Sequence, residues 1–254
     1  MKLLFIGDVV GNIGCQFLRK RLPQLKHQYQ TDVVIINGEN SADGNGITSF
    51  SAQQLFQAGA DVITTGNHAF QRKSDFRIYE NSTIIRPANY GDACPGNGFT
   101  VLDFGNCQIA VINLAGVLFM EALENPFDTI DSILSSIPTK NIFVDFHAEA
   151  TSEKKAMGFY LAQRVTAVLG THTHVQTADA CILSDHTGYI TDVGMTGAEN
   201  SVLGMDKKIA LDRMHLHLPL RYREATGNCW MNAVLLDFDQ KCGKCTKITS
   251  LIVR

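Results

Sequence analysis

The chain has 254 residues, of which 19% are charged, and its formal net charge is -3. This length suits one large α/β domain, and the near balance of charge argues against a nonspecific nucleic-acid-binding protein, which would be basic. No apolar stretch approaches the roughly 20 residues that span a bilayer, and the first apolar run is too short for a signal peptide. We therefore expect a single domain over residues 1–254, located in the cytoplasm, with no membrane partner and no sequence-specific binding of nucleic acid.

The N-terminal half alternates predicted strands with predicted helices. Apolar runs predict strands at residues 3–6, 33–36 and 61–65, separated by helix-compatible segments at 13–28 and 51–58. Because these apolar runs are continuous and do not alternate with polar residues, both faces of each strand should be buried. The pattern indicates a parallel sheet covered by helices.

The rest of the chain adds a hairpin, two further helices and several strands. Gly105-Asn106 is a predicted turn between strands, and the other predicted elements are strands at 99–104, 108–114, 141–146, 166–169, 180–183, 188–192, 232–239 and 246–253, with helices at 126–137 and 152–163. Parallel strands first and hairpins later favour two sheets packed face to face with helices outside. We expect an α/β fold of this four-layer α/β/β/α kind.

Polar side chains follow the predicted parallel strands at the points where those strands end. They are Asp8, Glu39, Asn40, Asn67, His68, His147, His172 and His174. The carboxyl ends of parallel strands meet at one edge of a sheet, where ligands bind in open α/β folds. Five separate segments are therefore expected to converge on one crevice.

The chemistry of these side chains suits a metal site. Carboxylates, amide oxygens and imidazoles without cysteine favour Fe, Mn, Mg or Zn. The number of donors exceeds the four ligands of a single zinc, so we expect two divalent ions. Two neighbouring ions can hold the attacking and leaving oxygens of an in-line displacement at phosphorus, which favours hydrolysis of a phosphoester.

The same residues carry a family resemblance. Their order resembles the calcineurin-like metallophosphoesterases over residues 1 to 175, in the motifs Gly7-Asp8, Gly38-Glu39-Asn40, Gly66-Asn67-His68, His147 and Gly170-Thr171-His172-Thr173-His174. Two motifs depart from the usual Asp-x-His and Gly-Asp, because Asp8 is followed by Val9-Val10 and Gly38 by Glu39. These departures are similar to the YmdB branch, as are residues 191–197 and 203–206, so the resemblance extends over nearly the whole chain.

The resemblance implies a role for each motif residue. One ion would be surrounded by Asp8, Glu39, Asn40 and His174, and the other by Glu39, Asn67, His147 and His172, with Glu39 bridging the two. His68 would face the phosphate as the catalytic residue and protonate the leaving oxygen or stabilise developing charge. The branch is associated with hydrolysis of phosphodiesters, notably 2′,3′-cyclic nucleotides, by a hydroxide held between the metals that attacks phosphorus in line.

Other interpretations stay open at this point. The chain could be a metal- and nucleotide-binding regulatory protein whose hydrolysis is incidental or absent. A dinucleotide-binding loop at residues 7–14 is disfavoured, because its glycine spacing departs from G-x-G-x-x-G and Asp8 would repel a pyrophosphate. The substrate is expected to be a small phosphoester or cyclic nucleotide, selected by loops at 42–48, 86–98, 116–126 and 196–203, and a homo-oligomer is left open.

Two short motifs away from the strand ends are expected to be structural. Cys242 and Cys245 form a lone C-x-x-C without the second pair of a structural zinc site, so we predict a hairpin turn. The absence of a secretory signal predicts that all cysteines are reduced thiols. His215 and His217 alternate with leucines, which predicts that they share the exposed face of a strand.

Overall fold

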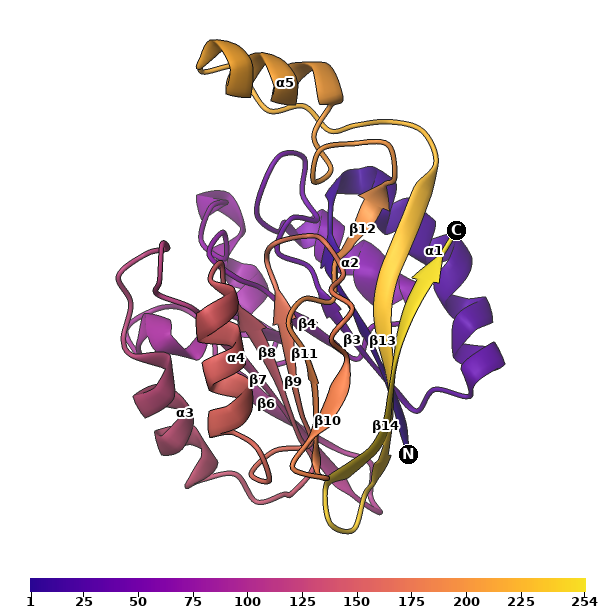
Figure 1. The fold of residues 1–254 in the computed structure, drawn as a ribbon, viewed down its shortest axis with the longest axis vertical. Coiled ribbons are helices and arrows are strands. Elements are labelled where there is room, and N and C mark those ends of the chain that lie inside the picture. Colours follow the sequence, from indigo (N-terminus) through magenta and orange to yellow (C-terminus); the bar gives the residue numbers. More distant parts are fainter.

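Two β-sheets pack face to face in the computed structural model, which describes residues 1–254, and helices cover both outer faces (Figure 1). The four-layer α/β/β/α arrangement expected from the sequence is therefore confirmed. No helix is long and apolar enough to cross a membrane.

The first sheet is built on four parallel strands, β1 (Lys2–Ile6), β3 (Val33–Asn37), β4 (Val62–Thr64) and β5 (Ile84–Ile85). On the other side of β1 lies the antiparallel strand β13 (Cys229–Asp239), which pairs in turn with β14 (Lys244–Val253). The short strands β2 (Asp8–Val9) and β12 (Met195–Ala198) pair with each other, and β12 also pairs with the first residues of β13. The C-terminal part of the chain thus completes the sheet that the N-terminal part begins.

The second sheet has the order β10, β11, β9, β8, β7, β6. Its strands are β6 (Phe99–Asp103), β7 (Gln108–Ala115), β8 (Ile142–His147), β9 (Ala167–Thr171), β10 (Cys181–Leu183) and β11 (Thr187–Ile190). The pairs β7–β8, β8–β9 and β9–β11 are parallel, while β6 and β7 form the predicted antiparallel hairpin. Parallel strands in both sheets direct their carboxyl ends toward the same end of the molecule (Figure 1).

Three hydrophobic cores hold the layers together. Helices α1 (Gly11–Tyr29) and α2 (Ser49–Ala58) pack on the outside of the first sheet, where Leu18 and Leu22 contact the strands. Helices α3 (Pro126–Leu134) and α4 (Thr151–Tyr160) cover the second sheet in the same way. Between the sheets, Phe5, Phe143 and Leu169 belong to a third core. Each fully buried side chain of this size stabilises the fold by about 1.5–3 kcal/mol.

The remaining helices are two 3-10 segments, η1 (Lys73–Glu80) and η2 (Ala88–Tyr90), and one helix that projects from the body, α5 (Lys207–Leu216) (Figure 1). Here one expectation is wrong, because His215 lies in α5 and His217 at its C-terminal cap instead of in a strand. Asp206 caps the helix by accepting a hydrogen bond from the Ile209 backbone N–H at 3.1 Å, which starts a helix where the leucine alternation indicated a strand. Both histidines are exposed, as expected.

The predicted turn is confirmed at Cys242, which lies between β13 and β14, while Cys245 already belongs to β14. All seven cysteines are free.

Candidate metal centre

All eight residues predicted for the site meet at the carboxyl ends of the strands. Asp8 lies in β2, just after β1, and the other seven follow or end β3, β4, β8 and β9, namely Glu39, Asn40, Asn67, His68, His147, His172 and His174. The carboxylates and amides come from the first sheet, and the last three histidines come from the second. The site therefore sits where the two sheets meet.

Glu39 is the centre of the cluster. Its carboxylate is fully buried, with Oε2 at 3.0 Å from His147 Nε2 and Oε1 at 2.6 Å from His68 Nδ1. Burial alone would raise the pKa of Glu39, but the neighbouring histidines hold it below its ordinary value. The backbone of Gly66 approaches so closely that a Cβ there would lie 1.7 Å from Glu39 Oε2. Only glycine fits at that position without displacing the carboxylate.

Asp8 links the cluster to the loop that follows β9. Its Oδ2 accepts a hydrogen bond from the His172 backbone N–H at 3.1 Å, and its Oδ1 lies 3.8 Å from both His147 Nδ1 and His174 Nε2. Burial raises the pKa of Asp8 above its ordinary value, although these two histidines oppose the shift. The loop backbone and the carboxylate thus hold each other in place.

His147 and His172 approach each other across the site. His147 Nε2 lies 3.1 Å from His172 Nδ1 and 3.0 Å from Asn67 Oδ1. Burial opposes charge on His147, but the carboxylates of Glu39 and Asp8 raise its pKa to about 9. Burial and the proximity of His147 lower the pKa of His172 to about 3. One ligand atom each from Glu39, His147 and His172 lies within 4.8 Å of the others, as a shared metal ion requires.

Several buried acceptor atoms of the cluster lack a hydrogen-bond donor. Asp8 Oδ1, Asn40 Oδ1 and both carboxylate oxygens of Glu39 are buried and receive no hydrogen bond of normal geometry. Buried polar atoms without partners are costly and rare in folded proteins. Divalent cations would satisfy these oxygens together with the imidazole nitrogens, so the residues present fit the metals that the sequence implies.

The outward nitrogens of two histidines are occupied by other groups. His172 Nε2 lies 3.0 Å from the Glu149 carboxylate, and His174 Nδ1 donates to the Leu203 carbonyl at 3.1 Å. Such partners orient a metal-binding imidazole and decide which nitrogen faces the metal. Glu149 was not predicted as a site residue, although its position two residues after His147 was a usable signal.

A buried ion pair holds the loop between His172 and His174. Asp192 Oδ2 accepts from Lys154 Nζ at 2.7 Å and from the Thr173 backbone N–H and hydroxyl at 3.0 and 2.7 Å. The two histidines have φ of 99° and 64°, a left-handed conformation that non-glycine residues rarely adopt. Such a strained backbone conformation persists where surrounding contacts hold it in place. Asp192, paired with Lys154, supplies these contacts through Thr173.

The cluster opens into a pocket of about 280 Å³. Beyond the cluster itself, its walls include Val10, Asn45, Leu203 and Tyr222. Asn45 Nδ2 lies 3.2 Å from His68 Nε2. Two loops expected to set selectivity, 42–48 and 196–203, therefore reach the pocket, whereas 86–98 and 116–126 do not line it.

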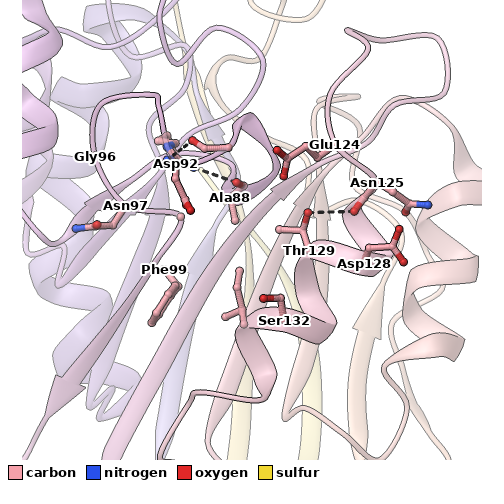
Figure 2. A pocket seen from close by; sticks show the side chains of 14 residues that line it. Ala88, Asp92, Gly96, Asn97, Phe99, Glu124, Asn125, Asp128, Thr129 and Ser132 are labelled. Atoms are coloured by element: carbon pink, nitrogen blue, oxygen red, sulfur yellow. Dashed lines mark hydrogen bonds between the residues drawn. The ribbon is translucent and has the colours of Figure 1, made fainter.

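A larger cavity, about 600 Å³, lies between the 86–98 loop and α3 (Figure 2). Three acidic side chains line it, those of Asp92, Glu124 and Asp128. The guanidinium of Arg86 donates to the backbone carbonyls of Pro87, Ala88 and Gly91, so it supports the loop. The cavity contains none of the eight predicted residues, and its size alone does not indicate chemistry.

Known proteins are similar to this chain over its whole length. A 2′,3′-cyclic-nucleotide 2′-phosphodiesterase from Bacillus subtilis is 44% identical over 256 residues, covering 100% of this chain and 97% of that protein. The crystal structure of a novel phosphatase from Mycoplasma pneumoniae is 32% identical with a TM-score of 0.95, covering 100% of this chain and 93% of the other. A hypothetical protein from Thermus thermophilus gives 39% identity and a TM-score of 0.94, covering 99% and 98%.

The sequence model of YmdB-like proteins matches residues 4–251, which includes every strand that carries a residue of the cluster. The chain belongs to the YmdB-like family.

Proposed function

We propose that this protein is a metal-dependent phosphodiesterase that hydrolyses 2′,3′-cyclic nucleotides. The observation that carries the proposal is the set of buried carboxylate and amide oxygens without donors, surrounded by histidines at the junction of the two sheets. The B. subtilis relative is named for this activity, and its similarity extends over the full length of this chain.

Two divalent ions would be held by two overlapping sets of side chains. One set is Asp8, Glu39, Asn40 and His174, and the other is Glu39, Asn67, His147 and His172. Bound there, the ions would lower the pKa of a water and stabilise charge on the phosphoryl oxygens. The proposal is supported by the separate contacts of the two oxygens of Glu39, one toward His68 and one toward His147.

His68 is proposed to donate a proton to the leaving oxygen. Its Nδ1 lies 2.6 Å from Glu39 Oε1 without hydrogen-bond geometry, and Nε2 lies on the pocket side next to Asn45. Nε2 accepts a hydrogen bond from Asn45 Nδ2 in the structure, so a proton taken up at Nε2 would replace that hydrogen bond and be donated to the oxygen that leaves phosphorus, while the carboxylate fixes the orientation of the ring. Asn45 would hold the unprotonated Nε2 at the pocket before the proton is taken up.

The pocket walls are proposed to receive the nucleoside. Val10, Leu203 and the ring of Tyr222 offer apolar surface beside the polar cluster. A base that stacks on the tyrosine would place its cyclic phosphate at the cluster, because the same pocket contains both.

A substrate panel tests the proposed activity. The purified protein is loaded with Mn²⁺ or Fe²⁺ and incubated with 2′,3′-cyclic AMP, 3′,5′-cyclic AMP and bis(p-nitrophenyl) phosphate, with products identified by phosphorus NMR. Turnover of the 2′,3′-cyclic nucleotide is expected. Metal-loaded protein that hydrolyses none of these compounds would instead support the regulatory, nucleotide-binding role.

The His68→Ala variant tests the assigned role of His68. Turnover should fall by about 10²- to 10⁴-fold, as for loss of a general acid, with the metal content unchanged. His27→Ala, which removes an exposed histidine of α1, is the matched control and should behave as the wild type. Loss of the metals from the His68 variant would show that His68 is instead required for metal binding.

We also propose that residues 1–254 act as one domain in the cytoplasm. β13 pairs with β1, so the two ends of the described chain share one sheet. Seven free cysteines suit a reducing compartment.

A further inference from the structure

Beneath the cluster, the carboxylate of Asp145 joins the two sheets. Asp145 lies on β8 and is 1% exposed. Its Oδ1 accepts from the Thr171 hydroxyl at 2.7 Å, and its Oδ2 accepts from Asn37 Nδ2 at 2.9 Å and from the Thr64 hydroxyl at 2.5 Å. Asn37 and Thr64 belong to the first sheet, while Thr171 ends β9 of the second. The network therefore has donors for both carboxylate oxygens of Asp145.

The hydrogen bonds of Thr171 determine where the proton of His147 lies. A hydroxyl has a single hydrogen, and the Thr171 hydrogen lies toward Asp145, because two oxygens 2.7 Å apart without a hydrogen between them would repel. Thr171 Oγ1 is also 2.9 Å from His147 Nδ1. It must therefore accept from that nitrogen, so Nδ1 carries a hydrogen and Nε2 of the neutral ring is left with a lone pair.

Nε2 of His147 points into the cluster, where its neighbours are acceptors, so in the metal-free protein it carries a second hydrogen that a metal ion would displace. His147 Nε2 lies 3.0 Å from Glu39 Oε2 and 3.0 Å from Asn67 Oδ1. The network reaches Glu39 as well, since Asn37 Oδ1 accepts the Glu39 backbone N–H at 3.0 Å. One buried carboxylate is thus connected to a candidate ligand on each sheet.

We propose that Asp145 and Thr171 are positioning residues of the metal centre, which fix His147 so that it binds a metal through Nε2. This inference rests on the proposed metal centre and is independent of which substrate is hydrolysed. Partners of this kind change metal affinity by about 10- to 100-fold when they are removed, because the ring loses its orientation and its proton is no longer held at one nitrogen.

A valine substitution at residue 171 removes the hydroxyl at nearly constant shape. We expect Thr171→Val to weaken Mn²⁺ binding by about 10- to 100-fold, and Thr171→Ser, which keeps the hydroxyl, to restore affinity to within about 3-fold of the wild type. Thr166→Val is the matched control. Thr166 is also buried and lies just before β9, but its hydroxyl accepts from the Ile142 backbone N–H at 3.0 Å, at the end of the strand away from the cluster. The control should lose stability and keep wild-type metal affinity.

The wild-type protein provides a second measurement that needs no variant to fold. In the zinc-loaded protein, ¹⁵N-resolved NMR of the imidazole of His147 should show a slowly exchanging hydrogen on Nδ1 and none on Nε2. A hydrogen on Nε2 would overturn the proposal, as would wild-type Mn²⁺ affinity in Thr171→Val or an equal loss of affinity in Thr166→Val. Failure of the phosphodiesterase proposal would look different, because substrate turnover would be absent while these metal-binding results stayed as expected.

Discussion

Replacement of Gly66 by alanine is expected to disable the metal centre while the sheets still assemble. A Cβ at this residue would lie 1.7 Å from Glu39 Oε2 and 2.4 Å from His147 Nε2. Even a separation of 3.0 Å, below which real Cβ contacts essentially do not occur, requires a shift of about 1.3 Å. Metal–ligand distances tolerate only about ±0.2 Å. We therefore expect metal affinity to fall by at least about 10-fold, the lower end of what a disturbed ligand environment produces.

Equilibrium dialysis against Mn²⁺ with elemental analysis measures this loss, and urea unfolding of the metal-free protein measures stability. Overpacking of this kind should lower the free energy of unfolding by about 1–3 kcal/mol. Gly197→Ala is the control, because the nearest atom to its added Cβ would be Val10 Cβ at 3.3 Å. Wild-type Mn²⁺ affinity in the Gly66 variant would refute the argument from close packing.

Three further outcomes are expected. The pKa of His147 is raised to about 9 in the metal-free protein, so metal binding must displace a proton. Mn²⁺ affinity should therefore rise about tenfold per pH unit between pH 6.5 and 9. An affinity independent of pH would contradict this. Lys154→Met leaves the charge of Asp192 buried without its cation and should lower the free energy of unfolding by about 3–5 kcal/mol, as measured by urea titration. A loss below about 1 kcal/mol would show that the ion pair contributes little. Tyr222→Ala should raise KM for 2′,3′-cyclic AMP by about 5- to 100-fold, because stacking of the base is lost. KM for glycerol 1,2-cyclic phosphate, which has no base, should stay unchanged. Equal effects on both substrates would exclude base recognition by this ring.

The strand-end cluster could be predicted from the sequence because it depends on local patterns. Each apolar run ended at a polar residue, and parallel strands bring such ends together whatever their order in the sheet. Asn67 and His68, for example, needed only the strand before them to be identified. The motifs then indicated which side chains belong to one site.

The supporting network could not be predicted in this way, because it depends on how the sheets pack. Asp145 appears in the sequence as one acidic residue within an apolar strand, and nothing nearby identifies Asn37 or Thr171 as its partners. Leu203 and Tyr222 reach the pocket from a C-terminal segment whose path depends on where β12 joins the sheet. The leucine alternation around His215 and His217 indicated a strand, whereas this segment forms the end of α5.

The place of β13 in the first sheet has a consequence for biosynthesis. β1 is synthesised more than 220 residues before its partner β13, so one of its two hydrogen-bonding edges is covered only when residues 233–237 have been made. Until then the nascent chain presents an apolar strand with an open edge, which is a template for pairing with other chains. Premature termination between residues 175 and 228 would therefore yield an aggregation-prone product that still contains every residue of the metal cluster.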